Sequence, residues 1–257
     1  MTALPSSHAS ICAIVTGHTR GLGAALAELL LARGIRVLGL GRGTNAALAA
    51  RHAAALSQTT LDLSDTAALE RWLSTDALRR FTAEARCVLL FNNAGTVEPI
   101  APCGAQAADA IARAVALNIA APLMLANAIA SQETASPAAE RRIVHVSSGA
   151  ARNAYAGWSV YCATKAALDH HARAVALDAP QAVRICSVAP GVVDTDMQAT
   201  IRSTAPHQFP SRERFEQLKQ NGQLATPEAA ARQLIDYALS EAFGSTPTAD
   251  VRELPKA

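Results

Sequence analysis

Aromatic residues and methionine are scarce in this chain, and its acidic and basic residues nearly cancel. The 257 residues include 2 tryptophans, 3 tyrosines and 3 methionines, and aromatic residues make up 4% of the sequence. The formal net charge is +2, and the lysines and arginines are scattered along the chain. A chain without a basic patch offers no electrostatic footprint for nucleic acid or for an anionic membrane. Neither is therefore expected as a partner.

Cysteine is present without a ligand pattern. The five cysteines are odd in number and show neither C-x-x-C nor mixed Cys/His spacing. Neither a disulfide framework nor a metal site is therefore expected, and a reducing, cytoplasmic location fits best.

Neither a long apolar run nor a secretory leader is expected in this chain. The first ten residues contain no basic region, and the apolar run that follows them is too short for a secretory signal. The run 24–32 is interrupted by Glu28 and is far shorter than the ~18 apolar residues of a membrane span. No membrane span is expected.

Strand-like and helix-like segments alternate along the chain, and half of its residues are hydrophobic. This alternation predicts an α/β fold, with a doubly wound parallel sheet and helices on both of its faces. At this length we expect one domain over residues 1–257. The expected strands are 11–15, 35–40, 58–63, 87–91, 143–146, 183–189 and 248–254. The main expected helices are 24–33, 46–56, 66–85, 105–131, a helix through Tyr161 to about 178, and 226–241.

A glycine turn joins the first expected strand to the first helix. The run Thr16-Gly-His-Thr-Arg-Gly-Leu-Gly23 has G-x-x-x-G-x-G spacing, which differs from the usual G-x-G-x-x-G dinucleotide fingerprint. Glycines let the backbone approach a diphosphate, and the helix amino terminus offers unpaired N–H groups. An ordinary helix entry gives a similar pattern, but the flanking strand and helix favour a cofactor. The cofactor candidates in this turn are Gly17, Thr19, Arg20, Gly21, Leu22 and Gly23.

The end of the second strand indicates which dinucleotide is bound. An Asp or Glu about twenty residues after the first glycine favours NAD, and this chain has none there. Arg42 lies there instead and can pair with a 2′-phosphate, with Arg20 on the other side, so NADP(H) is favoured. A solvated loop arginine is the alternative for Arg42. After the third strand, Asp62 and Leu63 are placed to face the adenine, although a helix cap also fits this segment.

Two later strand ends also carry cofactor candidates. The strand 87–91 ends in Asn92-Asn93-Ala94-Gly95; we expect the two asparagines to tie the backbone together, with Asn93 at the cofactor. Close cofactor approach is expected at Ala94 and Gly95. After the strand 183–189, backbone groups near a nicotinamide carboxamide are expected. The candidates there are Pro190, Gly191, Val193 and Thr195.

Tyr161 and Lys165 are four residues apart in an Ala-rich helical stretch. With about 3.6 residues per turn, their side chains rise from one face of a helix. A free tyrosine titrates near pH ~10, and a fixed positive neighbour favours the phenolate and lowers its pKa. Tyr161 is therefore a candidate general acid–base, with Ser148 beside it at the end of the strand 143–146. An amphipathic pair of buried ring and solvated charge is the alternative.

Asn118 lies in the apolar stretch 105–131, which Pro122 is expected to kink. A buried asparagine must find hydrogen-bond partners, so it either braces the backbone or holds a water leading to Lys165. The segment 192–222 has mixed polarity and is expected to act as a lid.

Together these motifs resemble the short-chain dehydrogenase/reductase family over nearly the whole chain. The matching motifs are TGHTRGLG, NNAG, Asn118, Ser148, YCATK and PGVVDT. The resemblance implies a Rossmann-like fold and NADPH-dependent carbonyl reduction, in which Tyr161 donates a proton and Ser148 orients the carbonyl oxygen. It also implies that Lys165 binds the ribose and lowers the tyrosine pKa, and that Asn118 holds a relay water. A homodimer or homotetramer is implied as well.

Within that family, the motifs look like those of sepiapterin reductases and their bacterial benzil-reducing relatives. A ketone or vicinal diketone is then the implied substrate, and Asp250 is a candidate anchor by position. Side chains that are candidates for an apolar substrate pocket are Tyr155, Trp158, Val193, Met197 and Phe209. A 3-oxoacyl thioester reductase or an alcohol dehydrogenase of the same family stays open, as does a sensor that binds NADP without catalysis.

Overall fold

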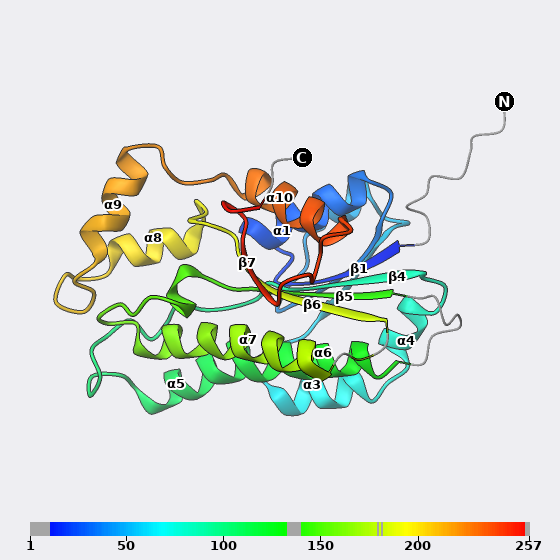
Figure 1. Ribbon diagram of the computed structural model, residues 1–257, viewed down its shortest axis with the longest axis horizontal. Coiled ribbons are helices and arrows are strands. Elements are labelled where there is room, and N and C mark those ends of the chain that lie inside the picture. Colours follow the sequence, from blue (N-terminus) through cyan, green and yellow to red (C-terminus); the bar gives the residue numbers. More distant parts are fainter. Residues whose placement is uncertain (1–10, 133–139, 179, 181, 255–257) are drawn as a thin grey trace.

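The computed structural model describes residues 11–132, 140–178, 180 and 182–254. A seven-stranded parallel sheet forms its centre, with the order β3-β2-β1-β4-β5-β6-β7 (Figure 1). The strands are β1 Ile11–Thr16, β2 Arg36–Gly41, β3 Leu56–Thr60, β4 Cys87–Asn92, β5 Glu140–Val146, β6 Val183–Ala189 and β7 Thr248–Asp250. The predicted doubly wound sheet is confirmed.

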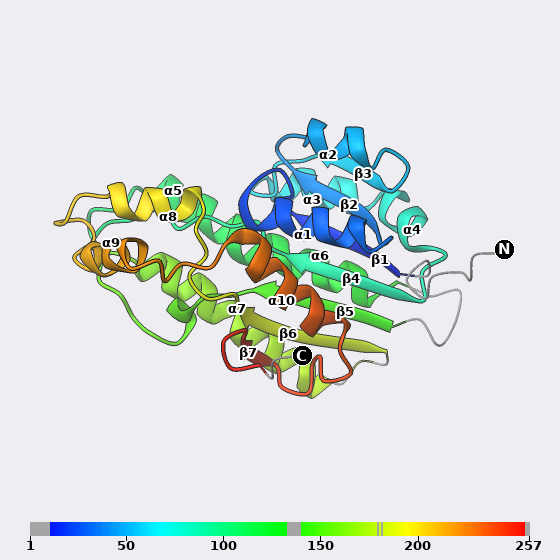
Figure 2. The same cartoon turned by 90° about the horizontal axis from the view of Figure 1, so that it is seen from above.

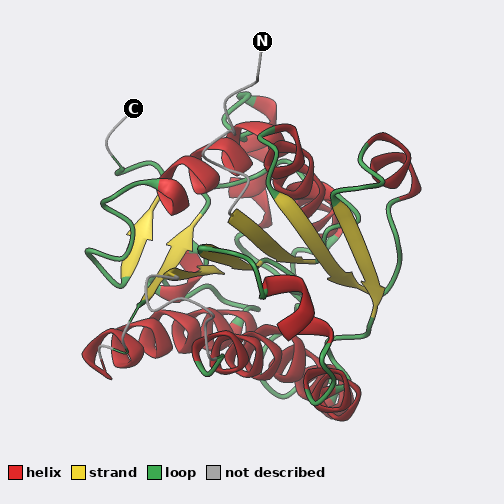
Figure 3. Cartoon of the chain, turned by 90° about the vertical axis from the view of Figure 1, so that its right-hand side faces the viewer, coloured by secondary structure: helices red, strands yellow, loops and turns green. Residues whose placement is uncertain are grey.

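Helices cover both faces of this sheet, so that it forms the middle of three layers (Figure 3). On one face lie α1 Gly21–Ala32 and α10 Pro227–Leu239, and on the other lie α3 Thr66–Leu73, α6 Ala121–Ala130 and α7 Ser159–Asp178 (Figure 1). The remaining helical segments are α2 Ala46–Arg51, α4 Ala77–Thr82, α5 Ala108–Val115, η1 Ala116–Ala120, η2 Gly149–Ala151, α8 Asp196–Ser203 and α9 Arg212–Gln220.

The direction of winding reverses between β1 and β4. The chain first adds β2 and β3 on one side of β1 and then places β4 on the other side. In such sheets a crevice opens at the carboxyl ends of the strands where the order reverses, and ligands bind there. The helices α8 and α9 stand beyond this same edge (Figure 2), so the fold places the expected cofactor loops and the expected lid together.

Local signals set many element boundaries. The central strands β1, β2 and β4 are buried along nearly their whole length, which matches their near-continuous apolar sequence. Side-chain caps begin α2, α3 and α10, where Asn45, Asp65 and Thr226 accept from the backbone N–H three residues on.

Two predicted helices are shorter than expected. The segment 66–85 is not one helix: α3 ends at Leu73 and α4 begins at Ala77. The hydroxyl of Thr75 donates to the carbonyl oxygen of Trp72 at 2.7 Å, so a local side-chain bond accompanies the break. The segment 46–56 ends as a helix at Arg51, and Leu56 already begins β3.

The apolar stretch 105–131 is interrupted, as predicted, but by a π-helical turn. Within η1 the N–H of Ala121 donates to the carbonyl of Ala116, five residues earlier. Pro122, near the start of α6, has no N–H for the carbonyl of Asn118 four residues before it. By length and apolar composition alone, Ala108–Ala130 passes the criterion for a membrane span. In this fold, however, α6 packs its buried side chains against the sheet.

Candidate active site

Ser148, Tyr161 and Lys165 meet at the carboxyl edge of the sheet. Ser148 follows β5 and caps η2 by accepting from the N–H of Ala150 at 3.1 Å. Tyr161 and Lys165 occupy successive turns of α7 and are 6% and 5% exposed. Ser148 is near enough to the Tyr161 phenol to favour its ionised form, which acts to lower the pKa of Tyr161. The three candidate catalytic side chains are thus brought together in a nearly dry environment.

The expected lowering of the Tyr161 pKa by Lys165 is wrong for this structure. Burial raises the pKa of Tyr161 to about 12, and the nearby Ser148 hydroxyl opposes that rise. The Nζ atom of Lys165 lies 5.8 Å from the centroid of the Tyr161 ring and donates to the carbonyl oxygen of Val146 at 2.7 Å. The ammonium is therefore bonded to the end of β5 instead of the phenol. Burial lowers the pKa of Lys165 itself to about 8.

The side-chain amide of Asn118 braces neighbouring backbone. Its Oδ1 accepts from the N–H of Thr96 at 2.9 Å, and its Nδ2 donates to the carbonyl of Thr96 at 2.8 Å and to the hydroxyl of Thr164 at 3.1 Å. The amide therefore braces the backbone, which is one of the two roles expected for Asn118, and the relay water stays a prediction.

The glycine turn fits a dinucleotide diphosphate. Gly17 has φ +70°, and a Cβ at Gly23 would lie 2.1 Å from the carbonyl oxygen of Gly17, so α1 begins directly on the turn. Arg20 precedes α1 and gives it no side-chain cap. The first N–H groups of α1 are therefore left for an anion, as diphosphate binding requires. Thr19 lies in the same turn, and Leu22 is buried behind it.

The segment Asn92–Gly95 is tied to the glycine turn. The hydroxyl of Thr16 accepts from the N–H groups of Asn93 and Ala94, both at 2.9 Å, and the Asn93 amide donates to the Thr16 carbonyl at 2.8 Å. A Cβ at Gly95 would lie 3.7 Å from Nζ of Lys165. The loop thus runs from the glycine turn to the catalytic cluster.

The two arginines expected at a 2′-phosphate, Arg42 and Arg20, have different surroundings in the structure. Arg42 is exposed just after β2, and Asp62 is exposed just after β3, ahead of the buried Leu63. Hydrogen bonds from Ser64 lower the pKa of Asp62, with a smaller contribution from Arg42. Arg20 instead donates to Asp196 in the first turn of α8 at 3.2 Å. Arg42 and Asp62 therefore share one end of the crevice, while Arg20 contacts the lid.

The segment after β6 closes over the glycine turn. Pro190 and Gly191 follow the strand, and Val193 forms a parallel bridge with Ala225. Thr195 precedes α8, and its Cγ2 would lie 3.2 Å from a Cβ at Gly21. The segment 192–222 therefore contributes α8 and α9 above the crevice.

An aromatic cluster lies beside Tyr161. Trp158 stacks on Phe209 with ring centroids 4.4 Å apart, and its ring lies 5.2 Å from that of Tyr161. Tyr155 and Met197 pack against the same cluster, whereas Val193 belongs to the main core. Four of the five expected pocket residues thus pack together beside Tyr161, and their role in binding a substrate stays a prediction.

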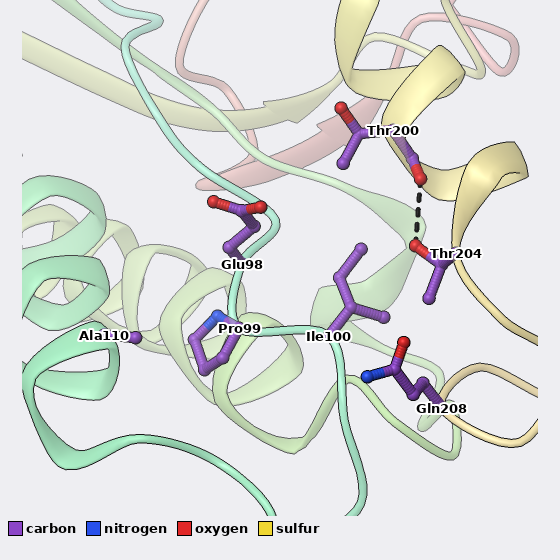
Figure 4. Close-up of a pocket in the computed structure, with 7 residues that line it drawn as sticks. All are labelled: Glu98, Pro99, Ile100, Ala110, Thr200, Thr204 and Gln208. Atoms are coloured by element: carbon purple, nitrogen blue, oxygen red, sulfur yellow. Dashed lines mark hydrogen bonds between the residues drawn. The ribbon is translucent and has the colours of Figure 1, made fainter.

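A pocket of about 360 Å³ is lined by the loop after β4, by α5 and by the lid segment (Figure 4). Its lining residues are Glu98, Pro99, Ile100, Ala110, Thr200, Thr204 and Gln208. Val97 and Ile201, which are chain neighbours of Glu98 and Thr200, pack in the same buried cluster as Tyr161. The lining contains one carboxylate and no basic side chain.

Asp250 does not present a free carboxylate. It is 3% exposed at the end of β7, and its oxygens accept from the backbone N–H of Arg252 at 3.0 Å and from the guanidinium at 2.8 and 2.6 Å. The bond from Arg252 lowers the pKa of Asp250. The expectation that Asp250 anchors a substrate is not supported, because both oxygens are already engaged.

Two buried polar groups next to the site were not predicted from the sequence. Asp169 is 4% exposed on α7, one turn beyond Lys165, and a charged residue at that spacing on a buried helix face is a usable signal. His145 is fully buried on β5 between Asn92 at 3.1 Å and His171 at 3.0 Å. No local pattern marked His145, since its partners come from other elements.

Curated relatives match this chain over most of its length. It is 34% identical to a benzil reductase ((S)-benzoin forming) of Bacillus cereus over 90% of this chain and 94% of the relative. It is 30% identical to a sepiapterin reductase of Meriones unguiculatus, over 92% of this chain and 94% of that protein. Both names match the resemblance found in the motifs, which is thereby confirmed.

Solved structures and a family model agree with these relatives. A short-chain dehydrogenase/reductase from Burkholderia vietnamiensis is 56% identical with a TM-score of 0.70, and the match covers 96% of this chain and all of that one. The family model for short chain dehydrogenases matches residues 11–206. This chain therefore belongs to the short-chain dehydrogenase family, whose members are oxidoreductases that bind a nicotinamide cofactor.

Proposed function

We propose that this protein is an NADPH-dependent reductase of small ketones or vicinal diketones. The observation that carries the proposal is the convergence of Ser148, Tyr161 and Lys165 beside a turn fitted to a diphosphate. The benzil reductase and sepiapterin reductase relatives support a carbonyl substrate.

The residues of this chain divide the reaction between them. The hydride that the carbonyl carbon gains would come from a reduced nicotinamide held at the glycine turn. Tyr161 gives its phenolic proton to the carbonyl oxygen, so the product is an alcohol. Ser148 holds that oxygen through its hydroxyl and stabilises the phenolate left behind. The Lys165 ammonium supplies positive charge to this buried site and binds the ribose hydroxyls.

Arg42 supports NADPH over NADH. Its exposed guanidinium follows β2, at the position where a ribose-binding acid favours NAD. Charge-assisted bonds to a 2′-phosphate are among the stronger interactions that an exposed arginine makes. The glycine turn and the loop Asn93–Gly95 would hold the remainder of the dinucleotide.

The pocket beside the lid supports a neutral or amino-bearing substrate. Glu98 is its charged lining residue, and Thr200, Thr204 and Gln208 offer uncharged hydrogen-bonding groups (Figure 4). Thioester carriers bear phosphates, which a pocket without basic side chains does not attract. A diketone or a pterin-like ring therefore fits this lining better than an oxoacyl thioester.

Two further features complete the proposal. The Ala-rich helices α5 and α7 carry partly exposed small side chains, and Val115 on α5 is 41% exposed. Such faces allow another helix to approach closely, so we place a homodimer or homotetramer interface on them.

All five cysteines are free, which is consistent with a reducing, cytoplasmic location.

The test compares Tyr161→Phe with Tyr237→Phe, because Tyr237 is on α10 in the main core. NADPH oxidation is measured with diketones, pterins and oxoacyl thioesters, alongside NADPH binding by fluorescence. We expect Tyr161→Phe to lose ~100-fold or more in kcat while binding NADPH normally, and Tyr237→Phe to remain active. Tight NADPH binding without turnover of any carbonyl by the wild type would favour the sensor alternative and defeat the proposal.

A further inference from the structure

Three ionisable side chains follow one another at four-residue intervals along α7. Tyr161 and Lys165 belong to the catalytic cluster, and Asp169 occupies the next turn on the same face. All three are buried, with Asp169 4% exposed. The carboxylate of Asp169 therefore lies one turn behind the ammonium of Lys165, on the side away from Tyr161.

The carboxylate is held by groups from three other parts of the fold. Its Oδ1 accepts from the hydroxyl of Ser147, after β5, and from the hydroxyl of Ser187, on β6, both at 2.7 Å. Its Oδ2 lies 3.4 Å from Nε of Arg152, whose side chain is 35% exposed. Polar partners of this kind are what allow a carboxylate to remain charged in a protein interior.

The ammonium of Lys165 has fewer polar partners, and burial disfavours its charged form. Burial lowers the pKa of Lys165 to about 8, and the charge of Asp169 acts against that lowering. The Nζ atom bonds to the carbonyl of Val146, which directly precedes Ser147. The partner of the lysine and a partner of the carboxylate are thus adjacent residues at the end of β5.

We infer that Asp169 is a positioning residue for the proposed reduction: its buried carboxylate keeps Lys165 charged and fixes the ammonium at the end of β5. The inference rests on the proposed function, in which the Lys165 ammonium is part of the catalytic cluster and would bind the ribose hydroxyls of the cofactor. The competing explanation is that Asp169 only ties β5 to β6. Its hydrogen bonds from Ser147 and Ser187 fit that purely structural role equally well.

The other groups around Lys165 do not replace this charge. Tyr161 is neutral at working pH, because burial raises its pKa. On β5, burial lowers the pKa of His145 to about 3, and burial also lowers the pKa of its partner His171, so both rings are neutral near pH 7. Arg152 adds positive charge behind the carboxylate. Among these groups, Asp169 is the one that brings negative charge to Lys165.

The lysine content of this chain permits a direct test. The sequence contains three lysines, Lys165, Lys219 and Lys256. Protein labelled with ¹³C at lysine Cε gives few resonances, and Lys219→Arg and Lys256→Arg identify that of Lys165. A titration from pH 6 to 10.5 then reports the pKa of Lys165 without any assay of activity.

Two substitutions should move this titration in opposite directions. Asp169→Asn keeps the size of the side chain and removes the charge, so the pKa of Lys165 should fall by about one unit or more. Arg152→Gln removes the positive charge beside the Asp169 carboxylate, so the pKa of Lys165 should rise by about half a unit. Ser187→Ala removes one hydrogen bond and keeps the carboxylate, and should change the titration little.

Activity gives a second readout that a purely structural role would not produce. The ratio of wild-type to Asp169→Asn kcat should be near one at pH 6, rise to about fivefold at pH 8 and approach about tenfold above pH 9, because the variant loses the lysine charge at lower pH. A ratio constant with pH, or a Lys165 titration unchanged in both Asp169→Asn and Arg152→Gln, overturns the inference. Should Asp169→Asn not fold, the upward shift in Arg152→Gln decides alone. Wild type that reduces no carbonyl while these shifts appear would refute the proposed function but not the charge coupling.

Discussion

The ammonium of Lys165 donates a 2.7 Å hydrogen bond to the carbonyl oxygen of Val146. This bond joins α7, which carries Tyr161, to the end of β5, two residues before Ser148. This bond therefore helps to hold the candidate proton donor near the hydroxyl that assists it.

Replacing this lysine should damage the reaction more than the fold. Lys165→Met keeps an unbranched side chain but removes the charge and the bond to Val146, so we expect kcat at pH 7 to fall about 100-fold or more. Lys165→Arg restores the charge with a bulkier, planar group and should recover part of the loss. Steady-state NADPH oxidation measures both, and a Lys165→Met enzyme within threefold of wild type would contradict the assignment.

Acid should destabilise the protein through His145. Burial lowers the pKa of His145 from 6.5 to about 3, so between these values the unfolded chain binds a proton that the folded protein does not. The free energy of unfolding should therefore fall as pH drops from 6.5 towards 3. Urea unfolding at pH 7.5, 6.5 and 5 measures this slope, above the range in which carboxyl groups titrate.

His145→Gln provides the comparison for that slope. Glutamine can bond to Asn92 and His171 without taking up a proton, so the pH dependence above 5 should become shallower, even if stability at pH 7.5 is lower. An identical slope in both proteins would assign the acid sensitivity to other groups.

Cofactor preference should depend on Arg42. Arg42→Ala removes the exposed guanidinium after β2, and we expect KM for NADPH to rise about tenfold with KM for NADH little changed. Arg51→Ala is the matched control, since Arg51 is also exposed but is paired with Glu28. Equal effects of Arg42→Ala on both cofactors would show that this residue does not read the 2′-phosphate.

The close approach of α1 to the glycine turn should make Gly23 intolerant of a side chain. A Cβ at Gly23 would lie 2.1 Å from the carbonyl oxygen of Gly17, whereas a Cβ at Gly43 meets nothing within 4 Å. We expect Gly23→Ala to lower the free energy of unfolding by about 1–3 kcal/mol and to weaken NADPH binding. Gly43→Ala should be neutral. Urea unfolding and fluorescence titration test both, and equal stability of the two variants would contradict the packing argument.

Glu98 should bias the choice of substrate by charge. Glu98→Lys places a cation in the pocket lining, so KM for a carboxylate-bearing diketone should fall about two- to fivefold relative to a neutral diketone. Glu98→Gln should give a smaller change in the same direction. A KM ratio independent of the charge at residue 98 would show that the substrate does not extend into this pocket.

Local sequence patterns were sufficient for most of the architecture. The strand Val183–Ala189 has the predicted bounds, because a β-branched, apolar run between polar turns has one stable place in a parallel sheet. The four-residue spacing of Tyr161 and Lys165 correctly placed them on one helix face, because an α-helix has about 3.6 residues per turn. Predictions failed where competing local signals decided, as at Thr75 between α3 and α4.

The electrostatics of the site could not be read in this way. The spacing of Tyr161 and Lys165 predicted a cation next to a phenol. In the fold both side chains are buried, and the Lys165 ammonium bonds to the carbonyl of Val146. Burial then raises the pKa of Tyr161. Asp250 lies at the position expected for a substrate anchor. Its carboxylate is instead bonded to the guanidinium of Arg252, two residues further along the chain.

Sequence alone thus determined the order of strands and helices, the glycine turn and the residues that face the carboxyl edge of the sheet, because each depends on contacts within a few residues. Tertiary structure decided how those residues are charged and bonded. Ser147, Ser187 and Arg152 reach Asp169 from separate segments, and only their convergence in a dry interior determines whether Lys165 keeps its proton.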